Sequence, residues 1–454
     1  MNNQKIDSKL NRRSFLRNTA IGAAGLAFSP AVFAQSTESK PDDINVALLG
    51  AGKEGQALMN ACLNIPGVRF KAVCDIWTAF NQRRVSRTLK AYKHDNNAYV
   101  DYKDMLANEK DLDAVIIATP DFWHSEHTVA CLDAGLHVYC EKEMSNKLDD
   151  AKKMVEAAKR TGKLLQIGHQ RRSNPVYRHC YEKLIGQADL LGRITTINGQ
   201  WNRSKAACED PGFPPNAVVD PATLAKYGYK SMSQFVNWRW YKGLGGGPIV
   251  DLGSHQIDIY SWFLDANPKS VMASGGIDYW KNQGWEWYDN VMAIFEYQTE
   301  KGTVRAFYQT ITTNSRAGYY ETFMGDEGMI NISEAPSPWN GIYREFWVDA
   351  KKWEKWAQAG FIKEIKQEEQ APVATGAAID ARQSPAPTRY EIGATLDKPP
   401  HQPHLENFFD AIRGKAKLNC PAEVGYETAA TVLKVNDAVE AARRLEYKPE
   451  EFKA

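Results

Sequence analysis

The sequence lacks several features that would point to common classes of protein. Over its 454 residues the charged side chains nearly balance, with a formal net charge of +1. Nucleic-acid binding depends on a concentrated positive field, and no long basic run is present, so we expect no nucleic-acid partner. No apolar run beyond the N-terminal region is long enough to cross a bilayer, so we expect no stable membrane insertion.

Cysteine is scarce, and its spacing favours neither disulfides nor a metal. The seven cysteines include no CxxC pair, and their number is odd. Several lie within apolar segments that we expect to be buried. We therefore predict reduced core thiols, no disulfide framework and no metal site.

The N-terminus has the organisation of an export signal. A basic segment, "NRRSFLR" at residues 11–17, precedes an apolar stretch from about Ala20 to Phe33, and Val32 and Ala34 supply the small residues that signal peptidase needs. The basic segment resembles the twin-arginine motif, which directs folded proteins across the membrane. We predict a periplasmic protein and, as its partner, the twin-arginine export machinery. The alternative is a disordered basic tail.

From Ile44 onward, short apolar strands alternate with helical segments. The strands are "NVALLG", "RFKAVCD", "DAVIIATP", "HVYCEKE" and "KLLQIG". Continuous apolar strands separated by helices indicate a parallel, doubly wound α/β sheet of the Rossmann type. After Gly168 the strands become longer and alternate apolar with polar residues, which predicts a second, α+β domain with a large, mostly antiparallel sheet.

These changes in pattern define the expected domains. We predict a signal peptide at 1–34, a linker at 35–43, a dinucleotide-binding domain at 44–168 and a substrate-binding and oligomerisation domain at 169–454. Within the last, residues 366–403 are rich in Ala, Pro and Gln and are expected to form a long loop or arm.

A glycine-rich turn, "GAGKEG", follows the first predicted strand directly and opens a helix. In that context the glycines permit a tight turn, close approach of a pyrophosphate and close helix–strand packing. Asp75 ends the next strand, where an acid can bind ribose hydroxyls, which favours NAD; Arg83 and Arg84 lie nearby and could serve the 2′-phosphate of NADP instead. The alternative is a turn without a ligand. The expected cofactor contacts are Gly50, Gly52, Lys53, Glu54, Gly55 and Asp75.

Two more segments end strands at the carboxyl edge of this sheet, where open α/β folds bind ligands. In "ATPDFWH", Thr119, Pro120 and His124 are expected at the cofactor, although Thr119 or His124 could simply cap the next helix. In "EKE", Glu141 and Lys142 end the fifth strand; Glu141 is expected at the cofactor, and a lysine there can orient a substrate hydroxyl. The alternative for EKE is a solvated charge cluster.

A second glycine run leads into "PIVDLGSHQID", which places Asp251 and His255 at i and i+4 on one helix face. A carboxylate beside an imidazole fixes its tautomer and raises its basicity, as a general base requires. The alternative is a capped helix with a structural histidine.

Tryptophans are numerous in the second domain, and aromatic faces suit sugar rings, although most tryptophans are core residues. The segment "NWRW" combines polar and aromatic groups, which points to carbohydrate. The expected substrate contacts are Lys142, Trp201, Trp238, Arg239, Asp251 and His255.

In combination, the glycine turn, "ATPDFWHSEH", "EKEMSN", "GHQRRSNP", "DLGSHQID" and the closing "HLENFFDAIRG" resemble the family of glucose-fructose oxidoreductase, inositol dehydrogenase and rhizopine catabolism proteins (Gfo/Idh/MocA). The resemblance implies a Rossmann domain followed by an open-faced sheet domain, and a homo-oligomer. It also implies that Lys142 is the catalytic lysine, Asp251 a substrate-site acid and His255 the acid/base. Arg171 and Arg172, with Asn174 and Pro175, match the segment close to the nicotinamide.

One departure from the family is Glu143, which stands where a proline usually follows the catalytic lysine. The resemblance and the leader together predict an exported oxidoreductase that transfers hydride from a sugar or glycoside hydroxyl to tightly bound NAD or NADP. The alternatives are a redox-neutral, NAD-dependent glycosidase and a sugar sensor without chemistry. Retention of Lys142, Asp251 and His255 together argues against the sensor.

Overall fold

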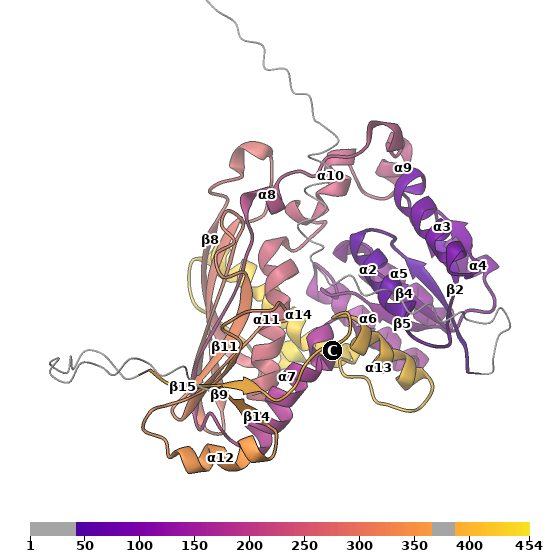
Figure 1. Cartoon of the computed structure of the whole chain (residues 1–454). Helices are drawn as coiled ribbons and strands as arrows, with labels where there is room; N and C mark the ends of the chain where they lie inside the picture. Colours follow the sequence, from indigo (N-terminus) through magenta and orange to yellow (C-terminus); the bar gives the residue numbers. More distant parts are fainter. Residues whose placement is uncertain (1–41, 366–385) are drawn as a thin grey trace, which may run out of the picture.

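The structure is a computed structural model, and it describes residues 42–365 and 386–454 (Figure 1). The predicted signal peptide, nearly all of the predicted linker and residues 366–385 of the predicted arm lie outside these ranges. The described strands form two sheets, one of six strands and one of ten.

The six-stranded sheet is wholly parallel, in the order β3-β2-β1-β4-β5-β6. Its strands β1 and β4 are almost completely buried, as their continuous apolar sequences predict. The short, partly exposed β3 was not expected, because "NAY" carries no apolar pattern. The strands are β1 Ile44–Leu49, β2 Val68–Cys74, β3 Asn97–Tyr99, β4 Ala114–Ile117, β5 His137–Cys140 and β6 Leu165–Ile167.

Helices connect these strands in alternation, which confirms the predicted doubly wound domain. The helices are α2 Lys53–Cys62, α3 Arg83–Ala91, α4 Tyr102–Asn108, α5 Asp121–Asp133 and α6 Leu148–Thr161. A π-helical turn, η1 at Thr78–Gln82, precedes α3.

The ten-stranded sheet has the order β14-β15-β13-β12-β11-β7-β10-β9-β8-β16. All its pairings are antiparallel except that of β7 with β10, which confirms the mostly antiparallel prediction. The strands are β7 Ile194–Asn202, β8 Pro268–Gly276, β9 Asn290–Thr299, β10 Gly302–Ile311, β11 Tyr319–Gly325, β12 Gly328–Ile332, β13 Gly341–Arg344, β14 Ile362–Glu364, β15 Thr388–Ile392 and β16 Leu445–Glu446.

Strand β15 corrects the prediction of a long loop at 366–403. It pairs with β13 and β14, and its Tyr390 is buried against Trp353, with ring centroids 5.3 Å apart. The segment was misread because its flanking Pro and Gly residues hide a short strand that has one inward-facing aromatic residue.

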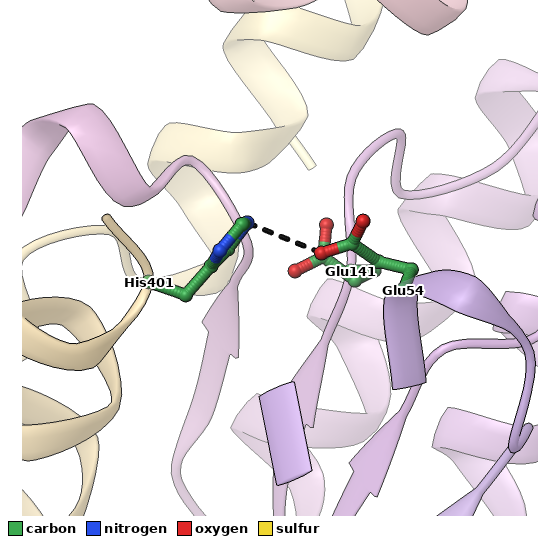
Figure 2. A group of neighbouring side chains, drawn as sticks. All are labelled: Glu54, Glu141 and His401. Atoms are coloured by element: carbon green, nitrogen blue, oxygen red, sulfur yellow. Dashed lines mark ion pairs between the residues drawn. The ribbon is translucent and has the colours of Figure 1, made fainter. Parts of the chain in front are cut away.

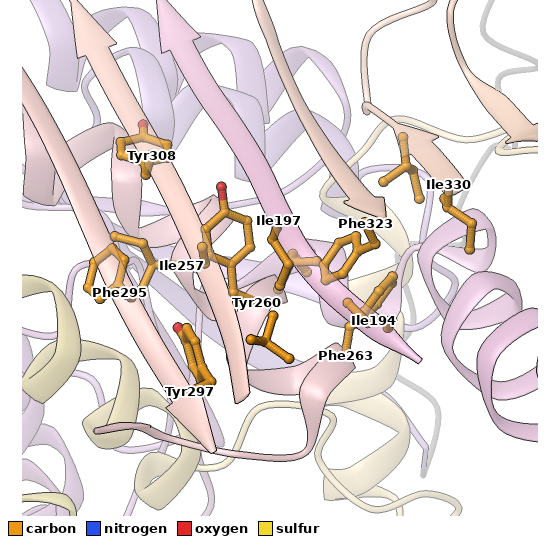
Figure 3. Close-up of a cluster of buried hydrophobic side chains, with 14 of the residues drawn as sticks. Ile194, Ile197, Ile257, Tyr260, Phe263, Phe295, Tyr297, Tyr308, Phe323 and Ile330 are labelled. Atoms are coloured by element: carbon orange, nitrogen blue, oxygen red, sulfur yellow. The ribbon is translucent and has the colours of Figure 1, made fainter. Parts of the chain in front are cut away.

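Two long helices cover one face of the large sheet, α11 Gly247–Leu264 and α14 Ala422–Ala441. The core between helix and sheet is aromatic and aliphatic, including Tyr260, Phe295 and Phe323 (Figure 3). Helix α14 also packs on α6, and α13 Gln402–Ile412 packs on α2 and β5, so the C-terminal segment ties the two domains together (Figure 1).

Shorter helices connect these elements. They are η2 Gln170–Ser173, α7 Pro175–His179, η3 Cys180–Gln187, α8 Lys205–Cys208, η4 Pro215–Ala217, α9 Pro221–Lys226, α10 Met232–Val236, η5 Trp238–Trp240, η6 Lys281–Gln283, α12 Ala350–Gln358 and η7 Pro449–Phe452. All seven cysteines are buried and free, which confirms the expectation of reduced core thiols. Among the described helices, none has both the length and the apolar character needed to cross a membrane.

Candidate active site

The glycine turn has the shape that a dinucleotide requires. Gly50 has φ +94°, and a Cβ there would lie 2.6 Å from the carbonyl carbon and oxygen of Ala118. A Cβ on Gly55 would lie 2.0 Å from the carbonyl oxygen of Gly50, so only glycine lets α2 pack so closely on the turn. A Cβ on Gly52 would meet nothing closer than 4.0 Å, which leaves open space where a pyrophosphate approaches.

The start of α2 also offers hydrogen-bond donors to an anion. No side chain caps this helix, and in the described ranges the backbone N–H groups of Gly52, Lys53 and Glu54 have no acceptor. Unused N–H groups at the N-terminus of a helix form an anion site, and the helix dipole strengthens it. The turn therefore fits the pyrophosphate of a nicotinamide dinucleotide.

Asp75 ties the turn to the end of β2. Its Oδ2 accepts from the Ala51 N–H at 2.7 Å, and its Oδ1 accepts from the Trp77 N–H at 2.6 Å. Oδ2 also accepts from Asn81 Nδ2 at 3.5 Å, so the second lone pair of Oδ1 is the one left for the predicted contact with ribose. Lys53, Arg83 and Arg84 are exposed around this end of the sheet.

The loop after β4 lies against the glycine turn, but its polar side chains already have partners. The two ring nitrogens of His124 lie 2.7 Å from the Glu143 carbonyl oxygen and 2.6 Å from the Thr119 carbonyl oxygen. The Thr119 hydroxyl lies 3.0 Å from His127 Nδ1. His124 therefore joins two loops of the site, and it has no nitrogen free for the predicted cofactor contact; Pro120, not His124, occupies the N-cap of α5.

Lys142 and Asp251 meet although they are far apart in sequence. Lys142 Nζ donates to the backbone carbonyl oxygen of Asp251 at 2.6 Å and to its Oδ1 at 3.4 Å. An ammonium group carries three N–H bonds, so one remains for a substrate oxygen. The Lys142–Glu143 peptide bond is cis, and Glu143 in the place of the family's proline does not keep the lysine from this site.

Asp251 is also held by Arg239, whose Nε lies 3.1 Å from its Oδ1. Burial raises the pKa of Asp251, but Arg239, Lys142 and Arg203 outweigh burial and hold that pKa well below its usual range. Asp251 is therefore a permanent anion within a group of cations.

The helix spacing predicted a hydrogen-bonded Asp251–His255 pair, and the structure does not form it. Asp251 pairs with Lys142 and Arg239, while His255 Nδ1 is buried and has no hydrogen-bond partner among the described residues. Cations from other elements compete successfully for the carboxylate, which spacing on one helix cannot reveal. Burial, reinforced by Lys142 and Arg171, lowers the pKa of His255 well below its ordinary value, so its imidazole is neutral at pH 7.

Aromatic residues surround the imidazole on the side of the second domain. The Trp201 ring lies 5.4 Å from the His255 ring and stacks on Tyr319 at 4.3 Å. Trp238 lies beneath the Arg239 guanidinium, 4.3 Å from the ring centroid. The predicted substrate contacts Trp201, Trp238 and Arg239 thus gather with Lys142, Asp251 and His255 at one site.

Arg171 and Arg172 have other partners than a nucleotide. Arg171 is buried between Glu321 and Glu334, and its Nε lies 2.7 Å from Glu334 Oε2. Arg172 Nε donates to both oxygens of Asp258 at 2.9 Å. Both charges are compensated within the protein, although Arg171 Nη2 has no partner in the described ranges, and the predicted contact of the two residues with the cofactor stays a prediction.

Two buried polar residues at the site, Asp121 and His169, are not predicted by the sequence pattern. Asp121 is buried, and burial together with Asp251 raises its pKa to about 7. His169 is buried with no partner for either ring nitrogen in the described ranges, and burial lowers its pKa to about 4. Asp121 stands within the quoted "ATPDFWH" and His169 within "GHQRRSNP", but no local spacing distinguishes either from a capping or core residue.

Glu54, Glu141 and His401 form a group in which the nearest oxygen and nitrogen atoms all lie within 4.8 Å of one another. Figure 2 shows them converging from α2, from the end of β5 and from the segment before α13, with His401 Nε2 3.1 Å from Glu54 Oε1. Burial and the charge of Glu54 raise the pKa of Glu141 to about 8. Such a group resembles a metal site, but it adjoins the nucleotide turn, where the sequence predicts Glu54 and Glu141 to face the cofactor; His401 was not foreseen.

Glu143 continues this acidic region toward the interior. It is buried, its Oε1 accepts from the Met144 N–H at 2.7 Å, and its Oε2 has no partner in the described ranges. Burial raises the pKa of Glu143 to about 8, so the carboxyl group is largely protonated at neutral pH. The departure from the family's proline therefore adds a mostly neutral acid below Lys142.

Comparison with known proteins agrees with this architecture. A family model described as "Oxidoreductase family, NAD-binding Rossmann fold" matches residues 44–169, and one described as "GFO/IDH/MocA C-terminal domain" matches residues 185–331. A solved structure of the WlbA dehydrogenase from Bordetella pertussis, in complex with NADH and UDP-GlcNAcA, is similar in fold. It has a TM-score of 0.62 and 17% identity, and the match covers 89% of this chain and 99% of that one.

Curated relatives match over shorter stretches. The scyllo-inositol 2-dehydrogenase (NADP(+)) IolW of Bacillus subtilis is 29% identical over 236 residues, 52% of this chain and 55% of the relative. A glycosyl hydrolase family 109 protein of Shewanella pealeana is 29% identical over 175 residues, 34% of this chain and 38% of the relative. The chain thus spans only about half, or less, of these relatives. The two family models come from one family and together cover more than half of the chain, and the chain belongs to the Gfo/Idh/MocA oxidoreductase family.

Proposed function

We propose that the protein is an NAD(P)-dependent oxidoreductase that acts on a CH–OH group of a carbohydrate. The observation that carries the proposal is the meeting of the Lys142–Asp251 pair with neutral His255 at the edge of the sheet that also bears the open glycine turn. The dehydrogenases similar in sequence or fold support the same chemistry.

The nucleotide would be held by residues of the first domain. Gly52 and the free N–H groups of α2 would receive the pyrophosphate, and Asp75 would accept from the ribose. An acid at that position favours NAD, although IolW is named for NADP. When bound, the nicotinamide supplies the hydride acceptor for the carbon that carries the substrate hydroxyl.

Lys142 orients the substrate. Two of its three ammonium hydrogens are directed at Asp251, so the third can donate to the substrate oxygen from a fixed direction. Asp251 remains ionised beside it and holds the ammonium in place.

His255 accepts the hydroxyl proton. Its imidazole is neutral, and no described residue forms a hydrogen bond with either of its ring nitrogens, so the lone pair that accepts the proton is not committed to the protein. A lowered pKa makes a weak base, and proton acceptance is therefore expected together with hydride loss, when the hydroxyl becomes most acidic. Trp201 beside the imidazole would cover the apolar face of a sugar ring.

The N-terminal pattern leads us to propose export by the twin-arginine route to the periplasm. A cofactor released outside the cytoplasm would be lost by dilution, so we propose that the nucleotide binds before export and dissociates slowly. The reduced nucleotide would then transfer its hydride to a second substrate or return it to the first. We propose that the large sheet forms contacts between the subunits of a homo-oligomer.

A redox-neutral glycosidase is the second candidate, and the similarity to the glycosyl hydrolase family 109 protein favours it. In that scheme the hydride is removed and returned within one cycle while the glycosidic bond is cleaved. The same Lys142, Asp251 and His255 would act, and the net redox change would be zero.

A screen of sugars and aryl glycosides with the nucleotide-loaded protein tests both candidates. Reduction of the bound nucleotide, seen by its near-ultraviolet absorbance and identified by mass spectrometry, supports the oxidoreductase. Release of the aglycone without a net change in the nucleotide supports the glycosidase. Binding of a sugar with neither signal, unaffected by His255→Asn, would overturn both in favour of a sensor.

A further inference from the structure

The substrate side of the site brings three cations to one fully ionised carboxylate. Arg239, Lys142 and Arg203 hold the pKa of Asp251 well below its usual range. Four further acids face Lys142 or Arg239: Asp121, Glu54, Glu141 and Glu143. Burial raises the pKa of Asp121 to about 7 and the pKa values of Glu141 and Glu143 to about 8, so these three are at most partly ionised at neutral pH.

Of these three cations, Arg203 is the one that has no acidic partner among the described residues. It is half-buried just after β7, and its guanidinium makes no hydrogen bond and no ion pair with any described residue. It lies over the Trp201 ring, 5.5 Å from the centroid, and the same ring is 5.4 Å from His255. The unpaired charge therefore stands one aromatic ring away from the imidazole.

Arg239 is only partly used. Its Nε is paired with Asp251, its side chain remains 45% exposed, and its terminal nitrogens make no hydrogen bond with any described residue. The planar guanidinium offers a fork that matches a carboxylate. Arg203 and Arg239 thus approach the catalytic group from β7 and from η5.

The other arginines near the site show that this protein compensates arginine charges when it buries them. Arg171 is enclosed by two glutamates and Arg172 by Asp258. A structural role for Arg203 would be expected to come with a carboxylate partner, and the described residues provide none.

We propose that the substrate is an anionic carbohydrate, a uronic acid or uronoside, whose carboxylate is bound by Arg203 and Arg239 while its ring lies against Trp201. The unpaired guanidinium of Arg203 and the partly used guanidinium of Arg239 suit a single carboxylate. The inference rests on the proposed function, because it assigns the substrate class of the same site.

The test compares a hexoside with the matching uronoside, uronamide and 6-phosphate, using the nucleotide-loaded mature protein. The uronamide has the shape of the uronoside without its charge. We expect kcat/KM to be roughly 10- to 100-fold higher for the uronoside than for the uronamide, because a hydrogen bond to a charged group is worth more than a neutral one. The difference should lie in KM.

Arginine variants test whether Arg203 causes the preference for the uronoside. Arg203→Gln should lower the uronoside-to-uronamide ratio about tenfold, and Arg203→Lys should retain part of it. Arg305→Gln is the matched control, since Arg305 is 67% exposed on β10 and pairs with Glu296 at 3.6 Å. It should keep the wild-type ratio, and thermal unfolding checks that all three variants fold.

The outcomes separate this inference from the proposed function. Oxidation of the hexoside with no preference for the uronoside overturns the inference and leaves the oxidoreductase intact. Calorimetric binding of the uronoside that Arg203→Gln weakens, without any hydride transfer, supports the inference and overturns the oxidoreductase. A preference for the 6-phosphate over the uronoside would contradict the proposal that the substrate carries a carboxylate. An unchanged uronoside-to-uronamide ratio in both Arg203 variants would contradict it as well.

Discussion

Two groups of arginines lie a short distance apart in this molecule and differ in how their charge is met. Arg171 and Arg172 are enclosed by carboxylates and by aromatic rings, so their charges are compensated, although Arg171 Nη2 has no hydrogen-bond partner in the described ranges. Arg203 has no carboxylate partner in the described ranges, and Arg239 is partly exposed at the substrate side. The compensated pair ties elements of the protein together, and the other pair is available to a ligand. A motif rich in arginine is therefore no guide to binding until the partners of each side chain are known.

The largest expected effect is on protein stability, when a cation of the compensated pair is removed. Arg171→Met would leave the fully buried Glu321 without its cation and should cost about 3–5 kcal/mol of unfolding free energy. Arg203→Gln removes no carboxylate partner and loses only the contact with the Trp201 ring, so it should change stability by about 1 kcal/mol or less. Urea unfolding of the two variants measures both, and equal losses would contradict the comparison.

The next effect is on turnover. His255→Asn should lower kcat by roughly 10²- to 10⁴-fold, because it removes the proton acceptor while keeping a polar side chain of similar size. Nucleotide affinity should stay near that of the wild type, since the glycine turn lies on another element. Single-turnover absorbance and calorimetry separate the two quantities, and a variant as active as the wild type would remove His255 from the mechanism.

A smaller effect should appear in the pH dependence of stability. The pKa of Glu143 is raised to about 8, so the folded protein holds a proton there that the unfolded chain has already lost. Stability is therefore greatest below the unfolded pKa and falls as pH rises through about 8. Buried histidines such as His169, with lowered pKa values, act in the opposite direction only below about pH 6.5.

Glu143→Gln isolates this contribution, because the amide oxygen can still accept from the Met144 N–H. Between pH 6.5 and 8, the variant should lose about 1 kcal/mol less unfolding free energy than the wild type. Chemical unfolding at several pH values measures the slope. Identical slopes for variant and wild type would show that Glu143 is ionised in the folded protein.

The sequence anticipated the fold and the local parts of the site. Strand–helix alternation predicted the parallel sheet, and the glycine turn with Asp75 was recognisable because its chemistry lies in one short segment. Contacts between segments that are distant in the chain could not be predicted from the sequence. Asp251, for example, pairs with Lys142 and Arg239 and not with His255. Arg203, Asp121 and His401 join the site from separate elements, and no spacing marks them.

The most direct test of the central claim is nucleotide binding by wild-type protein and by Gly52→Val, measured by calorimetry and by mass spectrometry of the native protein. The nearest protein atom to a Cβ on Gly52 is Asn81 Nδ2, at 4.0 Å and at the end of a side chain, so the variant should fold, yet it would occupy the space left for the pyrophosphate. We expect wild-type protein to bind NAD or NADP and Gly52→Val to bind neither, with unchanged thermal unfolding in the absence of nucleotide. Equal binding by both proteins, or a folded wild-type protein that takes up neither nucleotide at millimolar concentration, would contradict the proposed oxidoreductase.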